Sequence, residues 1–170
     1  MNKEVAFLFT GLIFQKEVEE KTVRRLSDTF GKVIVKSDTI PFDFTDYYNR
    51  EMGEGLLREW IFFDCRIRQE TITDIKHKTI LIEEEFSKNK KRNVNIDPGY
   101  ITLSKVVLPT TKDCAHRIYL GNDIYAEVTL IFYKGEWQPQ KWTYRDYKTE
   151  TAISFFNECR QYILHDNSAL

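Results

Sequence analysis

The sequence has few cysteines and no pattern that is typical of a metal site. Its three cysteines, Cys65, Cys114 and Cys159, are far apart and include no CxxC pair. This spacing indicates neither a disulfide framework nor a structural zinc site. No HxH or HxxxH spacing occurs either, so we expect no metal ion. Reduced thiols are typical of cytoplasmic proteins, and we expect that location.

The motifs of the common nucleotide-dependent and hydrolytic enzymes are also missing. The chain contains no GxxxxGK[ST], GxGxxG, GxSxG or HExxH. P-loop nucleotide handling, dinucleotide binding on a Rossmann turn and serine hydrolase chemistry therefore have no sequence support. The sequence indicates no particular cofactor, and the cofactor stays unknown.

A strong net charge and a long apolar run are absent as well. The formal net charge is -1, which disfavours nucleic acid as a partner because such proteins usually carry a basic excess. The longest apolar run, residues 5–14, is too short to span a bilayer, so we expect no membrane partner. A length of 170 residues with 12 Phe, 9 Tyr and 3 Trp fits one folded domain over residues 1–170.

Hydrophobic periodicity predicts an α+β (or α/β) fold. The apolar run of residues 5–14 is typical of a central strand buried on both faces. We expect a mixed, mostly antiparallel sheet of about six strands with three helices packed on it. The predicted strands are residues 5–14, 32–41, 56–67 and several within 93–133. The first predicted helix covers residues 18–30 and is ended by Gly31. The second begins at Thr71, its apolar face ends at Phe86, and a basic run at 88–92 follows. The last extends from Thr149 or Thr151 to His165.

The segment 93–133 contains a hairpin whose register follows from side-chain alternation. A three-residue loop, Gly121-Asn122-Asp123, pairs Leu120 with Ile124 and keeps apolar residues opposite one another. The same register sets Arg117 against Glu127 and Tyr119 against Tyr125.

Charged residues near this hairpin allow two interpretations. An Arg117–Glu127 pair on its own is an ordinary surface ion pair, which contributes about 0–1 kcal/mol. However, Lys105 shares strand parity with apolar residues, and Lys112 follows two threonines. Several cations beside hydroxyls are typical of an anion site, because phosphate needs fixed donors and positive charge. We leave the anion site and the structural network open.

The anion-site hypothesis assigns roles to each group. Lys105, Lys112 and Arg117 would hold the anion. His116 would act as acid or base, oriented by Glu127 or Asp97. As strand neighbours, His116 and Arg117 point to opposite faces, so one shared cleft requires a bulge or strand end near Ala115. The tyrosines that would stack on a planar ligand include Tyr47, Tyr100 and Tyr119.

Two further segments have both a structural and a functional interpretation. Asp97-Pro98-Gly99-Tyr100 is first a turn, and alternatively presents Asp97 and Tyr100 to a cleft. Phe44-Thr45-Asp46-Tyr47 echoes Tyr144-Arg145-Asp146-Tyr147. Similar turn chemistry, with Asp46 as a cap, explains the echo, and the sharper hypothesis is two loops that flank one cleft.

Three stretches, PFDFTDYYNREMG, the run 93–130 and WTYRDY, resemble an uncharacterised prokaryotic family catalogued as domain of unknown function 4416. The resemblance covers almost the whole chain and implies a single-domain, soluble prokaryotic protein without an assigned activity. Some relatives are labelled GTP-binding, whereas this sequence has no P-loop. The resemblance supports the following motif positions without giving them roles: Asp46, Tyr47, Asp97, Tyr100, Lys105, Lys112, His116, Arg117, Tyr119 and Glu127.

Three functional hypotheses follow. The first is binding of a phosphorylated or nucleotide-like small molecule through the Lys/His/Arg/Glu cluster, extended by hydrolase or transferase activity. The second is a non-catalytic interaction module that forms a homodimer or partner surface. The third, RNA recognition through tyrosines and residues 88–92, ranks last because the net charge is near zero.

Overall fold

A computed structural model describes residues 5–166. All of its strands belong to one sheet in which the order is β2-β4-β1-β5-β6-β8-β7, with β3 also paired to β4 and β9 to β8. Every pairing is antiparallel. The strands are β1 (Val5–Phe14), β2 (Val33–Lys36), β3 (Ile40–Pro41), β4 (Leu57–Arg68), β5 (Val94–Ile101), β6 (Lys105–Thr110), β7 (Ile118–Gly121), β8 (Ile124–Tyr133) and β9 (Glu136–Pro139). The helices are α1 (Glu19–Phe30), α2 (Asn49–Met52), α3 (Ile72–Glu85) and α4 (Glu150–His165), with short 3-10 turns η1 (Lys16–Val18), η2 (Gln69–Thr71) and η3 (Asp146–Lys148).

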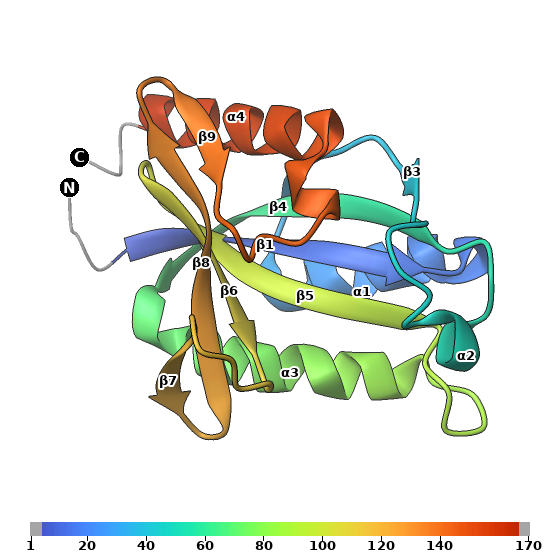
Figure 1. Ribbon diagram of the computed structural model, residues 1–170. Coiled ribbons are helices and arrows are strands. Elements are labelled where there is room, and N and C mark those ends of the chain that lie inside the picture. The colour runs from blue at the N-terminus through green and yellow to red at the C-terminus, as the bar shows by residue number, and fades with distance from the viewer. Residues whose placement is uncertain (1–4, 167–170) are drawn as a thin grey trace.

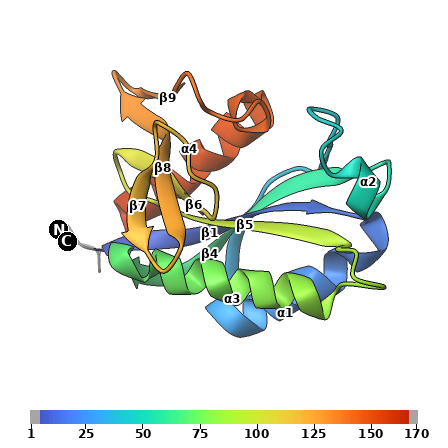
Figure 2. The ribbon, with the colours of Figure 1, turned by 60° about the horizontal axis from the view of Figure 1, so that its bottom comes forward.

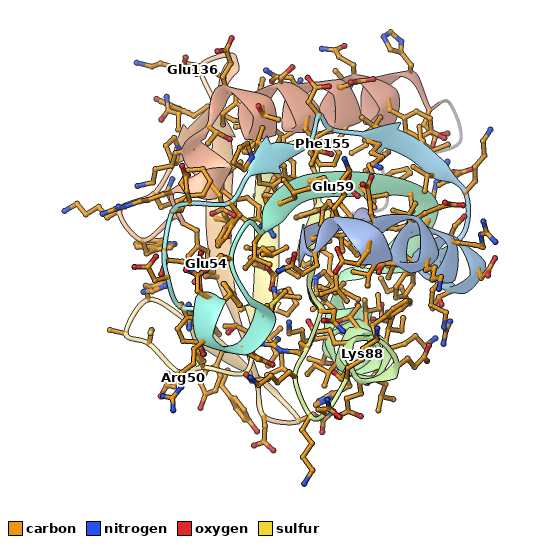
Figure 3. The ribbon with its side chains drawn as sticks, turned by 90° about the vertical axis from the view of Figure 1, so that its right-hand side faces the viewer. Arg50, Glu54, Glu59, Lys88, Glu136 and Phe155 are labelled. Atoms are coloured by element: carbon orange, nitrogen blue, oxygen red, sulfur yellow. The ribbon has the colours of Figure 1, made fainter. Side chains whose placement is uncertain are left out.

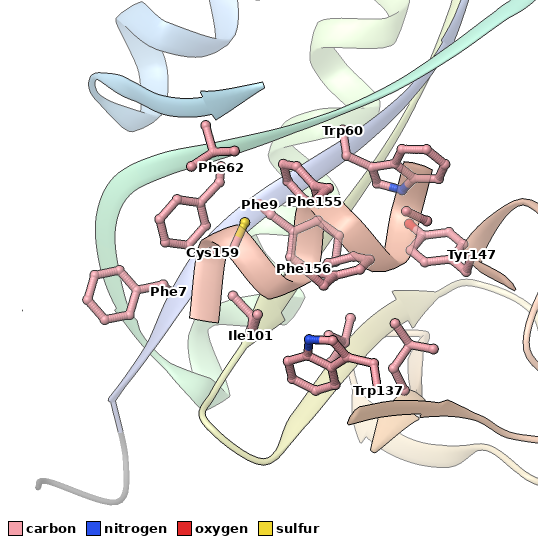
Figure 4. Packing of buried hydrophobic residues seen from close by; sticks show 14 of the residues in the cluster. Phe7, Phe9, Trp60, Phe62, Ile101, Trp137, Tyr147, Phe155, Phe156 and Cys159 are labelled. Atoms are coloured by element: carbon pink, nitrogen blue, oxygen red, sulfur yellow. The ribbon is translucent and has the colours of Figure 1, made fainter. Parts of the chain in front are cut away.

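Strand β1 lies at the centre of the sheet, as its apolar run predicts. Its alternate residues enter two different cores, because successive side chains point to opposite faces. Phe7 and Phe9 join the core beneath α4, whereas Ala6 and Leu8 join the core beneath α1 and α3. Figure 1 shows α4 on one side of the sheet and α1 and α3 on the other, and Figure 4 shows the aromatic packing against α4.

The α+β class and the three long helices are confirmed, but residues 5–166 form a sheet of nine strands rather than about six. The predicted strand at 32–41 is two short strands, β2 and β3, both paired with β4. The sequence predicts no strand after residue 133, but β9 follows β8 there and pairs with it. A fourth helix, the short α2, follows the 41–48 loop, and no side chain caps its start, so the expected capping role of Asp46 is wrong.

The segment expected to turn at Asp97-Pro98-Gly99-Tyr100 lies inside β5 instead. Proline fits there because β5 pairs with β6 only through Tyr100 and Ile101 within the described residues. Pro98 pairs with Thr10 of β1 on one side, and its other side has no ladder partner. Glycine fits because a Cβ on Gly99 would lie 2.4 Å from Cζ of Phe9. The glycine therefore allows close approach to a buried ring rather than a turn.

Gly99→Ala should destabilise the protein by roughly 1–3 kcal/mol, the usual cost of overpacking a filled core. The added methyl would contact Phe9 on one side and the carbonyl oxygen of Val107, at 2.8 Å, on the other. The shift in the urea midpoint at unchanged slope measures this loss. Gly121→Ala is the control for packing, because a Cβ added at Gly121 meets nothing within 4 Å. Its cost comes from backbone strain alone, since the φ of Gly121 is +96°. An unchanged midpoint for Gly99→Ala would contradict the packing argument.

The sheet divides where β5 and β6 separate. β5 pairs with β1 over eight residues, from Phe7↔Ile101 to Phe14↔Val94. Its pairing with β6 ends after Tyr100↔Val107. Beyond this point β5 continues toward α2, whereas β6, β8 and β7 turn away together (Figures 1 and 2). Residues from both faces of the sheet can therefore reach the opening between β5 and β6.

The β7–β8 hairpin keeps the expected pairing through a different turn. Tyr119 pairs with Tyr125 as predicted, but Gly121, not Leu120, pairs with Ile124. Asn122 and Asp123 have φ values of 51° and 58°, which is typical of a two-residue turn of type I′. An irregularity at Leu120 absorbs the extra residue, so the expected three-residue loop is wrong and the Tyr119 register is retained.

The basic run after α3 is not a helix end. The helix ends at Glu85, and residues 88–91 form a tight turn in which Lys88 and Lys91 are bridged. Arg92 then pairs with Glu51 of α2, with its Nε and Nη2 each 2.8 Å from a carboxylate oxygen. This pair fixes α2 beside the turn, and Figure 3 shows Arg50 of α2 and Lys88 of the turn on one side of the molecule. Within residues 5–166, no helix has the length and apolar character needed to cross a membrane.

Candidate functional site

A cavity of about 470 Å³ lies in the opening between β5 and β6. Two loops form most of its wall, residues 42–48 before α2 and residues 142–147 before α4. They contribute aromatic rings from both sides, including Phe44, Tyr48, Trp142 and Tyr144. The two echoing segments of the sequence therefore line one cavity, as the sharper hypothesis for them expects. We call it the aromatic cavity.

Arg58, only 1% exposed, forms the floor of the aromatic cavity. Its Nε lies 2.9 Å from Oδ2 of Asp146, and its Nη1 lies 3.4 Å from Oδ2 of Asp97. Its guanidinium carbon lies 4.8 Å from the ring centroid of Trp60 and 5.2 Å from that of Tyr147. Two carboxylates and two aromatic faces thus compensate a cation that would otherwise be very costly to bury.

Gly11 makes room for this cation. A Cβ at Gly11 would lie 2.8 Å from Nη2 of Arg58 and 3.0 Å from the Tyr147 hydroxyl. Burial lowers the pKa of Arg58, but the charge of Asp146 and its other neighbours outweighs burial and raises that pKa above its ordinary value. Burial also raises the pKa of Asp146, although Arg58 opposes the shift. Each charge of the ion pair therefore opposes the effect of burial on the pKa of its partner.

Glu127 organises the opposite wall and is only 3% exposed. Its Oε2 accepts a hydrogen bond from Nε of Arg117 at 2.9 Å and lies 2.9 Å from Nε2 of His116. Arg117 also donates to the Lys112 carbonyl at 2.8 Å and to the Tyr144 hydroxyl at 3.0 Å. The pair is therefore buried, and the surface ion-pair interpretation does not describe it.

His116 and Arg117 meet at one carboxylate because the strand begins after them. β7 starts at Ile118, so the two residues lie in the preceding turn and are free of strand alternation. This is the strand end near Ala115 that a shared cluster requires. The His116 ring stacks on Trp142 at a centroid distance of 4.9 Å and an angle of 12°. His116 thus supports the wall of the cavity from behind Trp142.

Lys112 stands at the mouth of the aromatic cavity. Its Nζ donates to the Tyr47 hydroxyl at 3.0 Å and lies 4.4 Å from the ring centroid. No carboxylate within residues 5–166 forms an ion pair with it. Arg145 also lines the aromatic cavity. Its side chain is exposed and has no ion pair among the described side chains. The mouth therefore offers positive charge that no carboxylate of the described residues neutralises in an ion pair.

The hydrogen bond from Lys112 lowers the pKa of the Tyr47 phenol. We expect Lys112→Met to raise that pKa toward the ordinary tyrosine value, because both the hydrogen bond and the nearby charge are lost. NMR titration of protein with 13C-labelled tyrosine rings would follow Tyr47 directly. Tyr162, whose pKa is raised by burial and by Asp64, provides an internal control, because it lines neither cavity and the substitution leaves both causes in place. A Tyr47 titration identical in both proteins would contradict the contact.

A second cavity, of about 660 Å³, adjoins the first. It is lined mainly by polar residues of α3, of the turn after α3 and of β5, and we call it the polar cavity. The two cavities share seven lining residues, namely Tyr47, Tyr48, Lys76, Asp97, Thr110, Lys112 and Tyr144. They therefore form one continuous cleft with an aromatic half and a polar half.

The structure brings together some of the residues that the sequence indicated. Asp97, Lys112, Tyr47 and Glu127 line the aromatic cavity, and His116 and Arg117 contact Glu127. Asp97 is on a different wall from His116, since Arg58 and Asn95 hold its carboxylate. The other four lie elsewhere: Tyr100 in the core, Lys105 paired with Ile131 at the far end of β6, Tyr119 on the β7 edge, and Asp46 exposed beside Asn49.

Sequence reasoning missed several residues of the cleft. Arg58 interrupts the apolar strand LLREWIFF, and a charge in such a run is the signal that could have found it. Asp146 and Tyr147 were present in the echo, but their equivalence to Asp46 and Tyr47 is limited, because Asp146 is buried and Asp46 exposed. Lys76 gave no signal, since a lysine on an amphipathic helix is normally solvated.

The arrangement combines ring faces, hydroxyl groups and unneutralised cations, which suits a planar anionic ligand. Residues 5–166 contain no group of three or more His, Cys, Asp and Glu side chains placed to hold a metal ion.

No curated protein and no solved structure matches the chain. A model of one protein family matches residues 4–162, nearly the whole sequence. The chain therefore belongs to the family described as Domain of unknown function (DUF4416).

Proposed function

We propose that the aromatic cavity binds a planar, anionic small molecule of the phosphorylated or nucleotide-like class. The observation that carries the proposal is the pairing of aromatic walls with Lys112, a cation without an ion pair among residues 5–166, at the mouth. A volume of about 470 Å³ lies within the range of small-molecule sites, roughly 300–1,000 Å³.

The two features serve different parts of such a ligand. Trp142, Tyr48 and Tyr144 provide ring faces, and stacking an aromatic group contributes about 0.5–1.5 kcal/mol beyond area burial. Lys112 and Arg145 provide positive charge at the mouth, where a phosphate remains partly solvated. Arg58 is compensated by Asp146 and Asp97 and so shapes the floor rather than neutralising the ligand.

Binding is better supported than catalysis. His116 and Glu127 are within hydrogen-bond distance, which is the geometry of an oriented acid or base. However, His116 stacks behind Trp142 and does not line the cavity, whereas Glu127 does. A hydrolase or transferase step would require Trp142 to move aside, so we propose a binding role first.

A thermal-shift screen with nucleotides and sugar phosphates tests the proposal. Lys112→Ala and Trp142→Ala should weaken any stabilisation, since one removes charge and the other a ring face. Lys105→Ala is the matched lysine control, because Lys105 lies outside both cavities. If the folded wild type is not stabilised by any ligand across the panel, the proposal fails.

The edge strand β7 supports the second candidate function, an interaction surface. It ends the sheet, and its Ile118 is 71% exposed beside the exposed Tyr119 and Leu120. An exposed apolar edge is a template for pairing with another strand. Light scattering of the wild type and of Ile118→Lys tests it, and a concentration-independent monomer for the wild type would exclude a homodimer.

A further inference from the structure

The polar cavity is large enough to bind more than a phosphate. Its volume of about 660 Å³ exceeds that of the aromatic cavity. A mononucleotide that occupied the aromatic cavity would therefore leave the larger half of the cleft empty. The two halves are continuous through shared lining residues, so one ligand can extend from one into the other.

Lys76 marks the junction of the two halves. It comes from α3, is only 9% exposed and lines both cavities. Its ammonium group has weak partners, the carbonyl of Ile96 at 3.4 Å and Oδ1 of Asp97 at 3.9 Å. An ammonium group has three donors and is costly to bury without acceptors. Lys112 lines both cavities as well, so two lysines face the point where the halves meet.

The chemistry of the polar cavity differs from that of the aromatic cavity. Apart from the three tyrosines that it shares with the aromatic cavity (Tyr47, Tyr48 and Tyr144), its lining consists of lysine, arginine, carboxylate, amide and hydroxyl groups with Ile80. Glu84 and Lys90 are both exposed, and neither side chain has a hydrogen bond or ion pair with another described residue. Free acceptors and donors of this kind suit hydroxyl groups, which both accept and donate.

We propose that the ligand is a two-part conjugate in which phosphate links a planar ring to a hydroxyl-rich group. The ring lies in the aromatic cavity, the phosphate between Lys76 and Lys112, and the hydroxyl-rich group, such as a sugar, in the polar cavity. This inference rests on the proposed function, since it assumes that the ring occupies the aromatic cavity. It excludes a simple phosphomonoester as the best ligand, because a monoester would end at the junction.

Matched ligand pairs test the proposal on the full chain. Calorimetric titration compares uridine diphosphate with its glucose conjugate, and adenosine diphosphate with adenosine diphosphate ribose. We expect at least one conjugate to bind about 10-fold more tightly than its parent, which corresponds to about 1.4 kcal/mol. The extra affinity would come from hydroxyl contacts in the polar cavity.

The double variant Glu84→Ala/Lys90→Ala identifies where that gain arises. It removes one negative and one positive charge, so the net charge of the cleft is unchanged, and both side chains are exposed. The conjugate should then bind no better than its parent, while the parent keeps its wild-type affinity. Lys105→Ala should leave both affinities unchanged.

The outcomes separate the two proposals. If none of the four nucleotides binds the wild type, the proposal that the protein binds a nucleotide-like ligand is wrong. If the parents bind and neither conjugate binds more tightly, the two-part ligand is overturned and the proposed function stands. A conjugate preference that survives in the double variant also overturns the inference, since the second group then lies outside the polar cavity.

Discussion

Arg58→Met should destabilise the protein by about 3–5 kcal/mol, the usual cost of leaving a buried charge without its partner. The substitution preserves most of the side-chain volume but leaves Asp146, which is buried, facing an apolar group. It also removes the cation from the faces of Trp60 and Tyr147. Urea unfolding followed by circular dichroism measures the loss.

Arg24→Met is the matched control, since Arg24 forms an exposed ion pair with Glu20 in which the arginine side chain is 72% exposed. Such a pair contributes about 0–1 kcal/mol, and methionine and arginine have similar helix propensities. An equal, small loss in both variants would show that the Arg58 pair is not needed. The paired change Arg58→Met/Asp146→Asn should be less destabilised than Arg58→Met alone, because no charge is left stranded.

The cost of Arg58→Met should also depend on pH. Burial raises the pKa of Asp146 in the folded protein above its unfolded value. The folded state then binds the proton more readily than the unfolded state, so the contribution of this group to stability is greatest below the unfolded pKa and declines as pH rises through the folded pKa. Without Arg58 the upward shift in the pKa of Asp146 becomes larger. The difference in free energy of unfolding between the wild type and Arg58→Met should therefore become smaller as the pH falls from above the folded pKa to below the unfolded pKa.

The elements that the sequence predicted are those whose local signals agree with their packing. The run of residues 5–14 became the central strand because, apart from Thr10 and Gly11, it is apolar on both faces and so can be buried on both. Gly31 ended the first helix with a φ of 102°, which only glycine adopts freely. Local pattern and tertiary burial favour the same conformation in these segments.

The sequence predicted the site only in part because the site depends on where the sheet divides. Whether β5 continues past its last pair with β6 is decided by tertiary pairing, and no residue pattern reports it. Glycine and proline at 98–99 indicated a turn by propensity, but Gly99 is required by the ring of Phe9. Lys105 appeared anomalous in its strand, yet it lies at the end of β6 remote from the cleft.

The sequence predicted the contact between Arg117 and Glu127 but underestimated how deeply the pair is buried. Side-chain alternation set the two residues opposite one another, and their side chains do meet. Sequence alternation gave no measure of depth, because the cover over Glu127 comes from the distant loop of residues 142–147. A pair that would contribute little at the surface is therefore an internal support of the cavity wall.

Glu127→Ala should be the second severely destabilising substitution, at about 3–5 kcal/mol. It leaves the largely buried guanidinium of Arg117 without a carboxylate and removes the partner of His116. Burial lowers the pKa of Arg117, and the hydrogen bond from Arg117 to Glu127, which opposes this effect, is lost in the variant. A guanidinium nevertheless stays protonated, so the Arg117 side chain must find water. Glu127→Gln retains an acceptor of the same shape and should lose less, about 1.5–3 kcal/mol for a hydrogen bond to a charged group.

The loss should spread through Arg117 to the mouth of the aromatic cavity. Arg117 donates to the Lys112 carbonyl and to the Tyr144 hydroxyl, so a guanidinium that turns toward water releases both. Hydrogen exchange of Glu127→Ala should accelerate in residues 110–117 by more than the loss of global stability explains, because these residues open locally. In α1, whose residues line neither cavity, exchange should accelerate only as far as the loss of global stability explains. Uniform acceleration in both segments would show that Glu127 supports only global stability. Local acceleration alone would mean that one buried carboxylate positions the cation and the ring on which the proposed ligand depends.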